Sequence, residues 1–84
     1  MMKIRVRADT MQDAEALSAI CGKFKGEILL KAGKYCVDAK SSLGFLALMY
    51  SAKDQLCLDA SALSETDRDR LMKAIRKYIV EDEA

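Results

Sequence analysis

Residues 24–41 read FKGEILLKAGKYCVDAKS, and this stretch decides the fold. Residues 26–31 and 34–39 each have the composition of a short strand, and Ala32-Gly33 lies between them. Because glycine adopts a positive φ angle without steric cost, the pattern predicts an antiparallel hairpin. The side chains expected to share a face are Ile28 with Leu30 and Tyr35 with Val37.

Upstream of the hairpin, the chain predicts one strand and one helix. Residues 3–7 (KIRVR) alternate charged and apolar side chains, as a half-buried strand does. Asp9 and Thr10 are both good N-cap residues, and Asp9 with Gln12 has capping-box spacing. We therefore expect a helix that runs to about Cys21. Its inward stripe is predicted to contain Ala14, Leu17, Cys21 and Phe24.

Downstream of the hairpin, a helix, a strand and a last helix are expected. Ser41 or Ser42 is suited to cap a short helix that ends near Tyr50. Residues 55–60 (QLCLDA) have the pattern of a fourth strand. Ser64 then opens the last helix. The buried stripe of this helix is expected to be Leu71, Ile75, Tyr78 and Ile79.

These elements follow the order β-α-β-β-α-β-α within a single domain of residues 1–84. Four strands with the helices on one face indicate an α+β fold. We expect a two-layer open-faced sandwich, in which three helices cover one face of a four-stranded antiparallel sheet.

Composition limits the classes of function. The chain has 84 residues, a formal net charge of +1 and 51% hydrophobic residues, as expected of one small globular domain. Balanced charge argues against nucleic acid as the main partner. No apolar run reaches the roughly 20 residues of a membrane-spanning helix, and the start does not resemble a signal peptide. We therefore expect a cytoplasmic protein that binds neither nucleic acid nor membrane.

Histidine and cysteine usage narrows the chemistry. The chain contains no histidine, which excludes histidine as general base, phosphoryl acceptor or metal ligand. Cys21, Cys36 and Cys57 are odd in number and form no CxxC pair, so we expect neither a disulfide framework nor a zinc site. Each lies in an apolar stretch and is predicted to be a buried small hydrophobe. No cofactor and no metal ion is expected.

Several short motifs in residues 24–41 resemble those of one known family. A phenylalanine-acid-isoleucine stretch leads into a Gly-Lys hairpin turn, and an Ala-Lys-Ser segment then caps a short helix. The matching residues are Phe24, Glu27, Ile28, Gly33, Lys34, Ala39, Lys40 and Ser41. In these motifs and in its element order the chain resembles the histidine-containing phosphocarrier protein (HPr) family of the bacterial phosphotransferase system.

The active-site loop of that family is not preserved. The family has a Gly-x-His-x-Arg-Pro-Ala loop before its first helix, and here the histidine position falls at Thr10 and the arginine position at Gln12. Asp13 takes the place of the proline. A threonine would form a phosphate ester too stable to pass on, since the carrier needs a labile N–P bond. We expect a divergent member that cannot carry phosphohistidine and is not an enzyme.

Two charged clusters have ordinary structural interpretations. Asp9, Asp13 and Glu15 gather near the first helix, where acids complement the helix dipole; we prefer this to a metal or acid–base site. Basic residues lie mainly on or near the expected strands, and no aromatic residues interleave them. We therefore expect a solvated sheet face rather than an RNA platform. These basic residues are Lys3, Arg5, Arg7, Lys23, Lys25 and Lys31.

The short helix has too many apolar residues for one buried face. Leu43, Leu46, Ala47 and Tyr50 share one side, and the resemblance implies that Leu43, Leu46 and Ala47 belong to a protein-docking surface. Expected partners are phosphotransferase enzymes or a transcriptional regulator, with a homodimer as an alternative. The resemblance also makes Ser41 a candidate for regulatory phosphorylation.

A second hypothesis is a small-molecule or anion-binding module on a ferredoxin-like sheet. Such a module needs a concave pocket with convergent polar groups, whereas a docking domain needs an exposed apolar patch.

Overall fold

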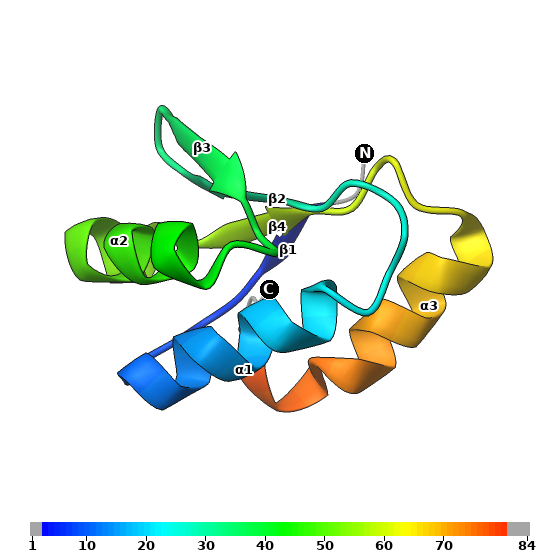
Figure 1. The fold of residues 1–84 in the computed structure, drawn as a ribbon, viewed down its shortest axis with the longest axis horizontal. Coiled ribbons are helices and arrows are strands. Elements are labelled where there is room, and N and C mark those ends of the chain that lie inside the picture. The colour runs from blue at the N-terminus through cyan, green and yellow to red at the C-terminus, as the bar shows by residue number, and fades with distance from the viewer. Residues whose placement is uncertain (1–2, 81–84) are drawn as a thin grey trace.

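The computed structural model of this protein describes residues 3–80 (Figure 1). Its elements alternate in the predicted order β-α-β-β-α-β-α, with two short 3₁₀ turns. The bounds are β1 Lys3–Arg5, α1 Met11–Cys21, β2 Leu29–Ala32, β3 Tyr35–Asp38, α2 Ser42–Ala52, η1 Lys53–Gln55, β4 Cys57–Asp59, α3 Glu65–Ala74 and η2 Arg76–Tyr78.

The four strands form one antiparallel sheet in the order β1-β4-β2-β3. The predicted hairpin is confirmed as β2 and β3, with Ala32 paired to Tyr35. The turn is therefore Gly33-Lys34 rather than Ala32-Gly33. Gly33 has a φ of +59°, which is typical of a type II′ hairpin turn.

The segment after α3 returns to the outer edge of the sheet. Val6 forms a β-bridge with Ile79, and the Val80 N–H donates to the Arg5 carbonyl at 2.9 Å. On the same side, the Arg7 N–H donates to the Tyr78 carbonyl at 2.8 Å. These bonds satisfy part of the β1 edge that would otherwise face solvent.

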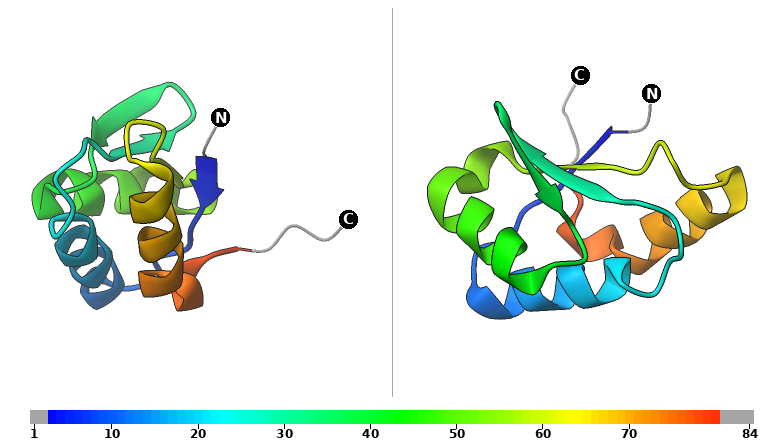
Figure 2. Two further views of the ribbon diagram at one scale, coloured as in Figure 1. Left: turned by 90° about the vertical axis from the view of Figure 1, so that its right-hand side faces the viewer. Right: turned by 45° about the horizontal axis from the view of Figure 1, so that its top comes forward.

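The helices pack on one side of the sheet and leave its other face open (Figures 1 and 2). The core between the two layers is almost entirely apolar. Its largest fully buried side chains are Phe45, Leu17, Ile28, Leu30, Leu56, Leu58, Leu71, Ile75 and Cys21. The predicted α+β sandwich with a four-stranded antiparallel sheet and three helices is thus observed.

Helix α1 follows its predicted pattern, but its cap differs from expectation. Its inward stripe of Ala14, Leu17 and Cys21 is buried, as is Phe24 beyond it. Thr10 and Asp13 form the capping box, and the predicted pair of Asp9 with Gln12 is wrong because Thr10 is the N-cap residue. The box pairs the cap with the third helical residue, which is Asp13.

The cysteines only partly follow the prediction that all three are buried. Cys21 is buried, Cys57 is half-buried and Cys36 is exposed. The reason is strand alternation, because Val37 faces α2 and its neighbour Cys36 must point to the open face. Cys36 and Cys57 both pair with Lys31 in the register of the sheet.

Replacing Gly33 with alanine should destabilise the domain by about 1–2 kcal/mol, because an L side chain at positive φ is strained. The new Cβ would also lie 3.2 Å from Oε1 of Gln55. Urea denaturation measures the free energy of unfolding. Gly22→Ala is the matched control: Gly22 has a φ of −64°, so alanine there should be neutral or stabilising by about 0.4–1 kcal/mol. Equal effects of the two substitutions would contradict this account of the turn.

Candidate functional site

Helix α2 has a buried face and an exposed apolar face. Phe45, Leu48 and Met49 are buried in the core. On the other side, Leu43 is 81% exposed and Tyr50 is 71% exposed. Ala47 is exposed, whereas Leu46 is half-buried and packs partly against the core. We call Leu43, Leu46, Ala47 and Tyr50 the α2 patch.

The first turn of α2 fixes which face turns outward. The Gly44 N–H donates to Oγ of Ser41 at 3.2 Å, so Ser41 caps the helix as predicted. A Cβ built on Gly44 would lie 3.3 Å from Cβ of Val37. Glycine therefore lets α2 approach β3 closely at this point, and this contact directs Phe45 into the core and leaves Leu43 in solvent.

Lys40 holds the segment before α2 in place. Its Nζ donates to the Phe24 carbonyl at 2.6 Å, which ties the β3–α2 connection to the segment that follows α1. Asp38 accepts a hydrogen bond from the Lys40 N–H at 2.9 Å. The Lys40 ammonium is thus engaged with the backbone rather than directed at the Ser41 hydroxyl.

A groove beside the α2 patch was not predicted from the sequence. It has a volume of about 390 Å³ and is lined by Tyr35 of β3 and by Ala47, Leu48 and Ser51 of α2. Tyr35 is 57% exposed. Alternation placed Tyr35 on the same face as Val37, but only the packing of α2 against β3 shows that its ring borders this groove. The candidate site therefore spans two elements.

Thr10 and Asp13, at two of the positions that the resemblance matched to a family loop, cap α1. The Asp13 N–H donates to Oγ1 of Thr10 at 3.1 Å. Oδ2 of Asp13 accepts from the N–H groups of Asp9 at 3.0 Å and of Thr10 at 3.3 Å. Gln12 is exposed in the first turn. A carboxylate thus occupies the helix start where an anion would otherwise bind.

The open sheet face is a solvated, charge-paired surface. Lys3 and Arg5 are exposed, and Nζ of Lys31 lies 2.9 Å from Oδ2 of Asp59. Arg7 pairs instead with Asp9, with Nε 3.0 Å from Oδ1. Among residues 3–80, no cluster of three or more histidine, cysteine or acidic side chains is arranged to hold a metal ion.

Asp59 is the most strongly perturbed carboxylate on this face. It accepts hydrogen bonds from the Ser61 hydroxyl, from the Lys31 ammonium and from the Ser61 N–H, and together they hold its pKa well below the usual range. By contrast, burial raises the pKa of the Cys21 thiol to about 11. Cys21 is therefore a neutral core residue at physiological pH.

A scan against protein-family models and a search of curated proteins both found no match. Within residues 3–80, no helix combines the length and hydrophobicity needed to cross a bilayer.

Replacing Asp59 with asparagine should lower the free energy of unfolding at pH 7 and have less effect at pH 3. The carboxylate's folded-state pKa is depressed, so the stability it contributes is fully present above its unfolded pKa of about 4 and is lost as pH falls. Urea midpoints at the two pH values measure this difference. Asp69→Asn, at an exposed position on α3, is the control and should change little. If Asp59→Asn lowered the urea midpoint equally at both pH values, the prediction would be wrong.

Proposed function

We propose that this chain is a non-catalytic, HPr-like docking domain that binds a protein partner through the exposed face of α2. The observation that carries the proposal is the α2 patch itself. Leu43 and Tyr50 stand in solvent on a helix whose sequence, SLGFLALMYSA, contains no charged residue. Contiguous exposed apolar surface of this kind marks interaction sites.

The composition of the patch favours a protein as the partner. Depletion of charge and the presence of an aromatic side chain are typical of the centre of protein interfaces. The groove bordered by Tyr35 adds a concavity that a partner side chain could fill. Covering Leu43 and Tyr50 would remove apolar area from water, which contributes about 25 cal/mol per Å².

The relation to HPr is part of the proposal. Support comes from the motifs of residues 24–41, from the order of elements and from the Ser41 cap. The capping contacts of Thr10 and Asp13 support a role without phosphohistidine, because a carboxylate at the helix start repels phosphate. A histidine-free member of that family would act by docking alone.

The class of partner follows from this relation. We propose a component of the phosphotransferase system or a transcriptional regulator that it controls, encountered in the cytoplasm. An uncharged patch attracts its partner chiefly by apolar contact, so binding should depend weakly on salt. A second copy of the chain is the competing occupant, and measurement of the oligomeric state tests it.

Leu43→Lys should weaken partner binding at least about tenfold, because it places a charge in a desolvated contact. The change in folding stability should stay within about 0.5 kcal/mol, since residue 43 is exposed. The general phosphotransferase enzyme is the first probe, titrated against isotope-labelled protein by NMR. Sedimentation of the protein alone detects self-association through the same face.

Thr66→Lys is the matched control, because Thr66 is an exposed residue on α3. Leu46→Lys should behave differently from Leu43→Lys and cost about 1–3 kcal/mol of stability, since Leu46 packs partly against the core. The docking face would be refuted if the partner shifted amide signals elsewhere but not those of α2. It would also be refuted if Leu43→Lys bound the partner as tightly as the wild type.

Ser41 is proposed as a regulatory phosphorylation site at the rim of the α2 patch. A phosphate there would carry about −1.5 to −2 charges and face the positive end of α2, so the domain should stay folded. The kinase that modifies the matching serine in the HPr family should label the wild type but not Ser41→Ala. Ser42→Ala is the control and should remain a substrate.

Removal of the Ser41 hydroxyl should by itself cost about 0.5–2 kcal/mol, because the Gly44 N–H loses its acceptor. If the kinase labels neither protein, or labels both, Ser41 is a cap and nothing more.

A further inference from the structure

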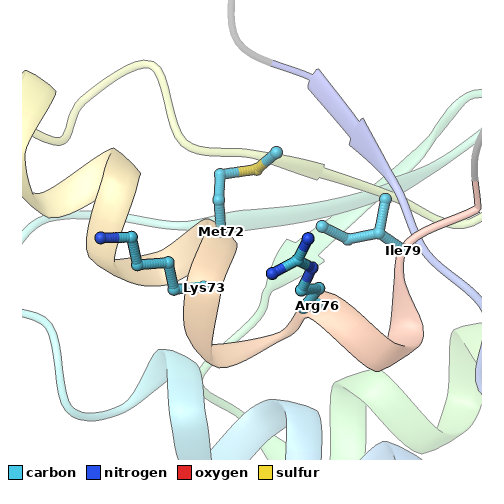
Figure 3. Close-up of a pocket in the computed structure, with 4 residues that line it drawn as sticks. All are labelled: Met72, Lys73, Arg76 and Ile79. Atoms are coloured by element: carbon cyan, nitrogen blue, oxygen red, sulfur yellow. The ribbon is translucent and has the colours of Figure 1, made fainter.

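A second concavity lies at the opposite edge of the sheet from the α2 groove. It has a volume of about 260 Å³ and is lined by Met72, Lys73, Arg76 and Ile79 (Figure 3). Ile79 is bridged to Val6, beyond β1, whereas Tyr35 of the α2 groove lies on β3 at the other edge of the sheet. We call this concavity the Arg76 pocket.

Two of the four residues that line the Arg76 pocket, Met72 and Ile79, are apolar. Met72 and Ile79 are half-buried and pack against the core. Both side chains project from their backbones into the space between α3 and the sheet (Figure 3). Since methionine is flexible and thioethers are polarizable, this wall adapts to the shape of an apolar ligand.

A cation stands at the mouth of this apolar space. In Figure 3 the Arg76 side chain lies between Met72 and Ile79, and the Lys73 ammonium points away from them along α3. Among residues 3–80, neither Arg76 nor Lys73 takes part in an ion pair or a side-chain hydrogen bond. Arg76 is therefore the cation best placed to receive a ligand.

Of the two cations, only Lys73 has a structural role at the end of helix α3. Lys73 lies in the last turn, where a cation complements the helix dipole. Arg76 lies outside α3, in the 3₁₀ turn η2, and shares the pocket with the apolar Met72 and Ile79 as well as with Lys73. A guanidinium that pairs with no anion in the described part of the chain, and that lies beside two apolar side chains, has the chemistry of a receptor for amphiphilic anions.

We propose that the Arg76 pocket binds a small organic anion with a short aliphatic body, a monocarboxylate of about six carbons. The carboxylate pairs with the Arg76 guanidinium in a bidentate fashion, and the alkyl chain lies against Met72 and Ile79. The pocket volume of about 260 Å³ lies just below the usual range of roughly 300–1,000 Å³, which favours a ligand of this size.

This inference is independent of the docking proposal. The two sites share no residue, and they lie at opposite edges of the sheet. Failure of the α2 patch to bind a partner leaves the Arg76 pocket unaffected, and the reverse also holds.

Hexanoate is the probe, titrated into the full isotope-labelled chain while amide and methyl shifts are followed by NMR. We expect saturable shifts at Met72, Lys73, Arg76 and Ile79, with an affinity in about the millimolar range for so small a ligand. Hexan-1-ol, which has the same chain without the charge, and acetate, which has the charge without the chain, should each bind at least about tenfold more weakly.

Arg76→Gln should weaken hexanoate binding about tenfold, because the charge-assisted pair is lost. Arg70→Gln is the matched control: Arg70 is an exposed arginine of α3 outside the pocket, paired with Asp67 at 3.2 Å. The control should bind hexanoate like the wild type.

Four outcomes would overturn the proposal. The first is shifts that do not saturate, and the second is shifts centred on Tyr35 and Ala47 of the α2 groove. The third is equal binding of hexanoate by wild type and Arg76→Gln with both proteins folded by circular dichroism. Equal affinities for hexanoate and hexan-1-ol would likewise exclude a role for the guanidinium.

Discussion

A sheet with one covered face is the constraint on which the rest of this structure depends. All helices pack against the same side of four short strands, so each helix can bury only one of its faces. Helix α1 meets this condition with a narrow inward stripe. Helix α2 does not, because it is apolar on both sides; Phe45 fills the core while Leu43 remains in water. Because the domain has only two layers, part of the apolar surface of α2 stays exposed.

The elements could be predicted from the sequence because their signals are local. Ala14, Leu17 and Cys21 repeat at helical spacing, and Gly33 marks the hairpin turn by its backbone freedom. Short-range signals fail where two residues compete for one role. Asp9 and Thr10 are both acceptable caps, and only the position of Asp13 in the first turn decides between them. Strand alternation, applied strictly, would have placed Cys36 on the open face.

The candidate sites also differ in how far local sequence signals could predict them. The exposure of Leu43 and Ala47 follows from helical geometry and from an excess of apolar residues, both visible in the sequence. The different burial of Leu46 depends on its packing against the core, which is a tertiary contact. The Arg76 pocket is further from prediction, since it forms between residues of α3 and η2 and Ile79, whose place is set by its bridge to Val6.

The return of the chain after α3 makes the sheet asymmetric. Hydrogen bonds to Arg5 and from Arg7 occupy the β1 edge, while β3 lies at the end of the observed strand order. An unpaired edge is a template for strand addition, so intermolecular β-pairing in this domain is directed to the β3 side. This edge strand has only four residues. Lys34 precedes it, and Asp38 is its last residue. Short length and flanking charge are the features by which sheet proteins limit edge-to-edge association of their strands.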